Sequence, residues 1–156
     1  MSEENQQFAI QKIYLKDVSF ESPNSPQAFT NSEWKPEISV QINSSNQTIA
    51  ENTYEVILDI TVTAKHEEKT AFLAEVKQAG IFTIAGFPQE NLGGMIGAYC
   101  PETLFPFARE AVSELVSKGG FPQLLLVPVN FNALYTQQMQ QQAEKVEGAT
   151  AEDATH

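Results

Sequence analysis

Apolar and polar side chains alternate along three stretches of this chain, residues 34–43, 54–64 and 71–84. Successive side chains of a β-strand point to opposite faces, so a period of two predicts strands with one apolar and one polar face. Sheets with one face in water are usually antiparallel, and the charged residues 65–69 suit a hairpin turn. We therefore expect an antiparallel sheet whose apolar face is covered by another element.

A further strand, the first in the chain, is predicted over residues 8–21. Its apolar residues occupy even, then odd, then even positions: Phe8 and Ile10, Ile13 and Leu15, Val18 and Phe20. A bulge near residues 14–16 explains this change of phase, and so does burial on both faces at an assembly contact. The loop at 22–32 contains two prolines and is long for a hairpin, which favours a Greek-key order with the first strand beside the fourth.

The cover of the sheet is predicted from residues 97–118, where apolar residues recur with the helical period. They are Leu104, Ala108, Ala111, Val112, Leu115 and Val116. Pro106 predicts a kink, or a helix that restarts near Phe105, because proline lacks the N–H that a helix interior needs. Lys118 followed by two glycines is a typical helix end.

A second, C-terminal helix is predicted from Phe131 to about Gln142, capped by Asn130. Residues 120–130 are apolar but contain two prolines, so we expect an extended, packed segment there. The polar residues 1–7 and the acidic residues 143–156 are expected to be disordered. The predicted fold is thus α+β, a four-stranded antiparallel, Greek-key-like sheet with one long kinked helix and a C-terminal helix, in a single domain of residues 8–142.

The chain carries a net charge of −11. Nucleic acids and anionic membranes attract clustered lysine and arginine, so a basic protein is a better expected partner than either. A single cysteine excludes an internal disulfide and suits a reducing compartment. The acidic, polar start does not resemble a signal peptide, and no apolar run approaches the roughly 20 residues that cross a bilayer. We expect a soluble, cytoplasmic protein.

Residues suited to catalysis are few, and we expect neither an enzyme nor a cofactor or metal. His66 lies in a charged turn and His156 is the last residue, so neither pairs with a nucleophile in an obvious way. Asp59 and Glu75 could form an acid–base pair, but two solvated strand carboxylates are the favoured interpretation. Cys100 is interpreted as a small buried hydrophobic residue rather than a nucleophile.

Several blocks of sequence resemble the SecB family of bacterial protein-export chaperones, over roughly residues 8–142. The blocks are IYLKDVSFE at 13–21, FLAEVKQAGIF at 72–82, GAYCPETLFPFARE at 97–110, GFPQL at 120–124 and PVNF at 128–131. The resemblance implies a holding chaperone that works without ATP, keeps precursor proteins unfolded and delivers them to SecA, the export motor. It also implies a homotetramer, a dimer of dimers, with Val76 and Gln78 tied to assembly.

The resemblance further implies that Asp17, Glu21, Leu73 and Glu75 form the contact for the basic, zinc-binding C-terminal segment of SecA. An apolar client surface is expected near the crossover loop and the last helix, from Phe29, Trp34, Leu124, Leu126, Val129, Tyr135 and Met139. The alternative function is a small-molecule or lipid-binding α+β module that uses the same apolar residues as an internal pocket. A helix on an antiparallel sheet is also similar to thioester hydrolases, although no catalytic carboxylate is evident on the helix.

Overall fold

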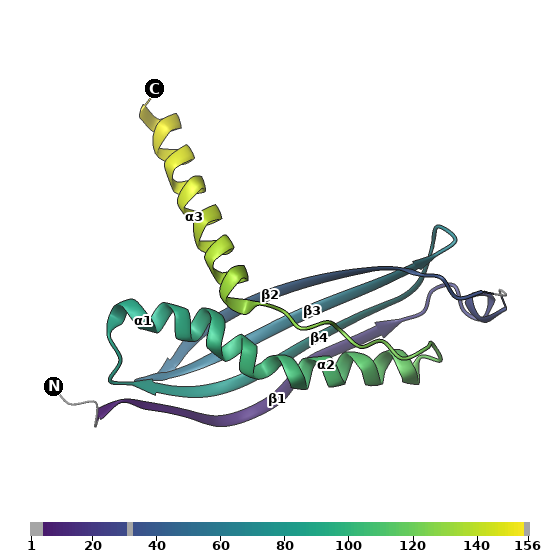
Figure 1. The fold of residues 1–156 in the computed structure, drawn as a ribbon, viewed down its shortest axis with the longest axis horizontal. Coiled ribbons are helices and arrows are strands. Elements are labelled where there is room, and N and C mark those ends of the chain that lie inside the picture. Colours follow the sequence, from purple (N-terminus) through teal and green to yellow (C-terminus); the bar gives the residue numbers. More distant parts are fainter. Residues whose placement is uncertain (1–4, 31–32, 155–156) are drawn as a thin grey trace.

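The computed structural model describes residues 5–30 and 33–154, which form one four-stranded sheet and its helices (Figure 1). The strands are β1 (Gln7–Glu21), β2 (Glu37–Ala50), β3 (Thr53–His66) and β4 (Lys69–Ala85). The helices are a short 3₁₀ turn η2 (Gln27–Phe29), α1 (Gln89–Gly94), a π-helical segment η3 (Met95–Tyr99), α2 (Cys100–Lys118) and α3 (Phe131–Ala154). The predicted α+β class is confirmed.

The sheet is antiparallel throughout and its strand order is β1-β4-β3-β2, so the predicted neighbourhood of the first and fourth strands is confirmed. The strands are longer than predicted. Residues 44–50, which lie beyond the alternating stretch 34–43, continue β2 to a tight turn at Asn52, whose φ is 55°. Their polarity reflects the exposure of an edge strand rather than a loop, because each of them except Ile49 has a register partner in β3.

Two irregularities in β1 resolve the change of phase in its sequence. The register with β4 shifts between Ile10 and Lys12 and again between Leu15 and Asp17, so that one residue is skipped each time. Each bulge reverses the facing of the residues that follow it. The predicted bulge near residues 14–16 is confirmed, and the one at Gln11 was not predicted.

Helix α2 covers one face of the sheet, packing mainly on β4 and β3. A Cβ atom at Gly80 of β4 would lie 3.0 Å from Leu104 of α2, so the even-numbered residues of β4 face this helix. We call this the helix face and the opposite one the outer face. The core between sheet and helix includes the predicted inward residues of β3 and β4, namely Val56, Leu58, Ile60, Val62, Phe72, Val76, Phe82 and Ile84.

Helices α1, η3 and α2 form one continuous helical run across the sheet (Figure 1). α2 continues through Pro106, so the predicted restart near Phe105 is wrong. Pro106 leaves the carbonyl of Glu102 without its usual helical N–H partner. Both residues are exposed, so water can bond that carbonyl and the helix need not break.

The end of α2 is a Schellman motif, as its two glycines predict. The N–H of Phe121 donates to the carbonyl of Val116 and the N–H of Gly120 to that of Ser117. Gly120 has a φ of 91°, in the left-handed region that glycine adopts without strain. The motif turns the chain back along the helix into the extended segment that was expected before Asn130.

The cap of α3 is also confirmed, because the side-chain oxygen of Asn130 accepts the N–H of Ala133 at 3.0 Å. The predicted end near Gln142 is wrong, since α3 continues to Ala154 and projects away from the sheet (Figure 1). Residues 143–154 are therefore helical where a disordered tail was expected, and they contain alanine and glutamate but no proline, which favours a helix. Of the two predicted disordered ends, residues 1–4 and 155–156 lie outside the described residues. Among the described helices, none is long and apolar enough to cross a membrane.

Candidate functional site

The four predicted docking residues lie together on the outer face of β1 and β4, and we call them the acidic patch: Asp17, Glu21, Leu73 and Glu75. In the register of the two strands, Asp17 pairs with Lys77, Ser19 with Glu75, and Glu21 with Leu73. Their neighbours Val18 and Val76 pair on the helix face. The sheet thus brings residues more than 50 positions apart in the sequence into one contiguous group.

The acidic patch is accessible to a partner. Asp17 and Glu21 are exposed, while Leu73 and Glu75 are partly buried. The hydroxyl of Thr61 donates to Glu75 at 3.2 Å, which orients this carboxylate from β3. Within the described part of the chain, none of the three carboxylates forms an ion pair, so each is able to receive a cation from outside.

Asp59 extends the negative charge of the patch onto β3. It pairs with Lys77 in register, and its Oδ1 atom is buried without a hydrogen-bond partner among the described residues. Burial raises the pKa of Asp59, and the nearby charge of Glu75 raises it further. Glu75 is therefore near enough to Asp59 to raise its pKa. The two carboxylates are diagonal neighbours rather than a directly opposite pair, because Asp59 pairs with Lys77 and Glu75 with Thr61.

Two of the predicted client residues belong to an aromatic cluster at one end of the molecule. The ring of Phe121 lies 4.9 Å from that of Phe29, 5.3 Å from Trp34 and 5.0 Å from Phe72. Phe29 is 49 % exposed, whereas Phe121 is buried. The central residue Phe121 was not predicted, although its place directly after the glycines of the helix end is a signal that could have found it.

The extended segment before α3 divides its apolar residues between the core and the surface. Leu126 is only 7 % exposed and packs in the core, so the prediction that it lines a free surface is wrong. Its neighbours Leu125 and Val127 are exposed instead, because side chains alternate along an extended chain. Leu124 and Val129 are partly buried against the core.

Tyr135 and Met139 of α3 lie apart from the aromatic cluster. Tyr135 packs on η3, where a side chain at Gly97 would collide with its ring. Together with Phe8, Met95 and Tyr99 it lines an open cavity of about 520 Å³. Met139, one turn further along α3, is half-exposed. The predicted client residues therefore form two separate apolar regions rather than one.

The two residues predicted to matter for assembly are buried within this chain. Val76 faces the core, and the side-chain amide of Gln78 donates to the carbonyl of Tyr14 in β1 at 3.0 Å. Gln78 also lines a cavity of about 350 Å³ between β1 and α2, to which Leu15 and Phe107 contribute. Val76 therefore has no exposed surface, whereas Gln78 borders this cavity.

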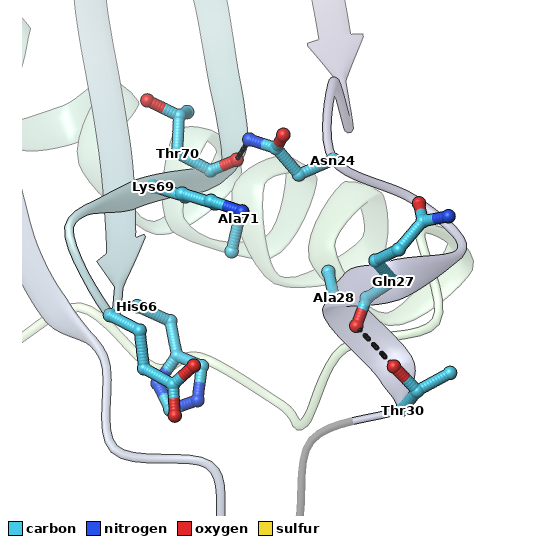
Figure 2. A pocket seen from close by; sticks show the side chains of 9 residues that line it. Asn24, Gln27, Ala28, Thr30, His66, Lys69, Thr70 and Ala71 are labelled. Atoms are coloured by element: carbon cyan, nitrogen blue, oxygen red, sulfur yellow. Dashed lines mark hydrogen bonds between the residues drawn. The ribbon is translucent and has the colours of Figure 1, made fainter.

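A further cavity, of about 410 Å³, lies between the crossover loop and the β3–β4 turn (Figure 2). The amide of Asn24 donates to the carbonyl of Thr70 at 2.8 Å and joins the loop to the turn. His66 lines this cavity, and its ring lies 5.4 Å from that of Trp34. The cavity therefore adjoins the aromatic cluster through His66.

Cys100 lies in the core with no exposed surface, as its interpretation as a small hydrophobic residue predicts. Burial raises the pKa of its thiol to about 12, so the reactive thiolate is rare at neutral pH. In the described part of the chain, no three side chains of His, Cys, Asp or Glu gather as a metal site would require.

Comparison with known proteins identifies relatives along almost the whole chain. Residues 1–142 match the family model described as "Preprotein translocase subunit SecB". The protein-export protein SecB of Nitrosococcus oceani is 62 % identical over 90 % of this chain and 87 % of its own length. That of Methylococcus capsulatus is 56 % identical over 96 % of this chain and 99 % of its own.

A solved structure has a similar fold despite low sequence identity. It is a SecB-like chaperone of Mycobacterium tuberculosis in complex with a peptide from an antitoxin. The TM-score is 0.64 at 15 % identity, over 78 % of this chain and 90 % of that chain. The likeness supports the arrangement of sheet and helices described above.

Proposed function

Because the chain belongs to the SecB family of preprotein translocase subunits, we propose that it is a holding chaperone for protein export. It keeps precursor proteins unfolded without ATP and delivers them to the motor SecA. The observation that carries this proposal is the match to protein-export proteins along residues 1–142, a range that spans the positions of the acidic patch. We place its work in the cytoplasm, where precursors are made, and assign it no catalytic step and no cofactor.

Unfolded clients bind to the two apolar regions, the aromatic cluster around Phe121 and the cavity beside Tyr135. Burying two or three client side chains at about 1.5–3 kcal/mol each contributes roughly 3–9 kcal/mol before ordering costs. One region therefore binds about micromolar at best. A long client that engages several regions at once is retained more tightly through effective concentration, while each contact stays unselective.

The acidic patch receives SecA, through the basic zinc-binding segment at its C-terminus. Three carboxylates without internal ion partners attract the segment, and Leu73 provides an apolar contact beside Glu21 at one end of the patch. Docking of this kind is fast and weakens as salt is added, because exposed charges are screened. Since the patch lies on the outer face, a client in the aromatic cluster does not block it.

The chain assembles as a homotetramer, a dimer of dimers. Its edge strand β1 leaves Ile10, Leu15 and Val18 about half-exposed on the helix face, where α2 covers little of it. A second subunit that packs there removes this apolar surface from water. Val76 and Gln78 support the contact from below by holding β4 and β1 together.

The proposed function is tested by aggregation of a reduced, unfolded client followed by light scattering. Near-stoichiometric protein should suppress the aggregation without nucleotide. If it fails to suppress aggregation, and a lipid instead co-purifies in a one-to-one ratio, the chain is the alternative lipid-binding module.

The docking part is tested with Glu75→Lys, which reverses a charge inside the acidic patch. The matched control is Glu51→Lys, the same change at the exposed β2–β3 turn. We expect Glu75→Lys to abolish SecA binding and leave client holding intact, and Glu51→Lys to affect neither. Loss of holding together with docking in Glu75→Lys would assign this residue a structural role instead.

A further inference from the structure

Glu55 is a buried carboxylate on the outer face of the sheet, the face that α2 does not cover. It is only 6 % exposed, although it alternates with the core residue Val56 and so belongs to the outer face. Its position pairs with Gln47 of β2 and Ile81 of β4. A buried charge needs several hydrogen-bond donors to replace the water it has lost.

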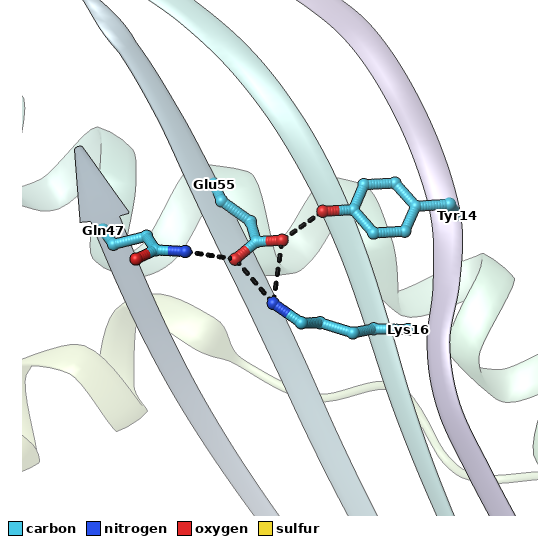
Figure 3. Close-up of polar contacts among 4 residues, drawn as sticks. All are labelled: Tyr14, Lys16, Gln47 and Glu55. Carbon is cyan, nitrogen blue, oxygen red and sulfur yellow. Dashed lines mark hydrogen bonds and ion pairs between the residues drawn. The ribbon is translucent and has the colours of Figure 1, made fainter. Parts of the chain in front are cut away.

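Glu55 obtains these donors from β2 on one side and from β1 on the other (Figure 3). The ammonium of Lys16 lies 2.9 Å and 3.0 Å from its two oxygens, and the amide of Gln47 donates to Oε1 at 2.9 Å. The hydroxyl of Tyr14 donates to Oε2. Tyr14 and Lys16 both come from β1, so they reach Glu55 across the whole width of β4.

These contacts keep Glu55 ionised. The hydrogen bond from Tyr14 and then that from Lys16 lower the pKa of Glu55, against the opposing effect of burial. The donors hold the carboxylate of Glu55 in place, and the carboxylate in turn holds the side chains that donate to it. The network is therefore a tie between β1 and β3 that does not depend on the backbone ladder.

The two β1 residues in this tie coincide with the second bulge. Leu15 pairs with Gln78 and Asp17 with Lys77, so Lys16 is the residue that the ladder skips. Without the skip, Asp17 would pair with Val76 and turn to the helix face, because a shift of one residue exchanges the faces of a strand. The position of the bulge thus decides whether the carboxylates of β1 point outward.

Apolar burial specifies this register only in part, through Phe20, whose ring lies 5.8 Å from that of Phe72 and 6.4 Å from that of Phe121. Leu15 is 53 % exposed and Val18 is 43 % exposed, although both lie on the helix face. β1 is also an edge strand, with β4 as its single partner in the sheet. Around the second bulge, from Leu15 to Val18, the strand buries little apolar surface, and such a stretch is prone to slip.

We propose that Glu55 is a positioning residue, which fixes the bulge of β1 at Lys16 and thereby holds Asp17 and Glu21 on the outer face as part of the acidic patch. The geometry of the network supports the positioning of β1 by Glu55. The expected effect on docking rests on the proposed function, the binding of SecA at the acidic patch. Glu55 itself is buried and does not touch the partner.

The test replaces Glu55 by glutamine, which keeps the shape but removes the charge, and follows backbone hydrogen exchange by mass spectrometry. We expect the amides of residues 14–21 to exchange at least about tenfold faster, while β3 and β4 keep their protection. SecA binding should weaken by about tenfold and client holding should persist. The matched control Gln47→Ala removes the donor on β2 and should leave β1 protected.

A rescue separates positioning from general stability. Lys16→Met should reproduce the effects of Glu55→Gln, whereas Lys16→Arg should behave as the wild type because its guanidinium still binds both carboxylate oxygens. Lys16→Met also serves as the test if Glu55→Gln does not fold, since Lys16 is largely exposed. Unchanged exchange in β1, or equal loosening of all four strands, would overturn the proposal. If the wild type itself does not bind SecA, the docking function fails while the exchange measurement still decides the role of Glu55.

Discussion

Two buried ionisable residues in this chain differ because of their partners. Cys100 at the start of α2 has no donor or charge near it, and burial alone raises the pKa of its thiol to about 12. Glu55 is also shielded from solvent, though less deeply, and the hydrogen bonds that it accepts from Tyr14 and Lys16 lower the pKa of its carboxyl. Desolvation favours the neutral form of a group, and only specific donors reverse that preference.

Cys100 is expected to be inert in the native protein. At pH 8, a thiol with a pKa of about 12 is ionised about a thousandfold less than one with the ordinary pKa of 9.0. Reaction with a chromogenic disulfide reagent should therefore be slow in buffer and fast in concentrated urea. Complete labelling of the folded protein within minutes would contradict the burial of this residue.

At the scale of elements, the ends of helices and the bulges of strands position the functional surfaces. The Schellman motif at Gly120 turns the chain so that Phe121 enters the centre of the aromatic cluster. The two bulges of β1 keep its apolar residues on one face in spite of the changes of phase. Gly93 of α1 and Gly97 of η3 allow Tyr135 of α3 to pack closely.

The helix end is tested with Gly120→Ala. A side chain at a φ of 91° is strained, and its Cβ would lie 3.2 Å from the ring of Phe29. We expect the free energy of unfolding to fall by about 1–2 kcal/mol, measured by urea denaturation at a constant protein concentration.

The control for this change is Gly94→Ala. Gly94 has helical backbone angles and open space around its Cβ position, so alanine there should be neutral or slightly stabilising. An equal loss of stability in the two variants would mean that the backbone conformation of Gly120 is not the cause.

At the scale of the whole molecule, the two faces of the sheet have different tasks. The outer face carries the acidic patch, while the helix face is covered by α2 in its middle and leaves apolar residues exposed along both edge strands. These are Ile10, Leu15 and Val18 of β1 and Ile38 and Val40 of β2. A chain that leaves this much apolar surface uncovered gains stability by association.

We therefore expect the native protein to have four times the mass of one chain, measured by light scattering after size exclusion. Leu15→Asp places a charge in the uncovered row of β1 and should shift the mass toward smaller species. Ile49→Asp, a change of similar exposure at the end of β2, should leave the mass unchanged. A wild-type protein that elutes as a monomer would refute the tetramer.

The periods of two and of 3.6 in the sequence determined which segments are strands and helices and which of their faces are apolar, because these patterns depend on neighbouring residues alone. The burial of Val56 and Cys100, the cap at Asn130 and the glycine end of α2 followed for the same reason. Only the tertiary structure decided which strand residues meet, since register depends on contacts between distant segments. The tie of Glu55 to Tyr14 and Lys16, the burial of Leu126 beside the exposed Leu125, and the full length of β2 and α3 all required it.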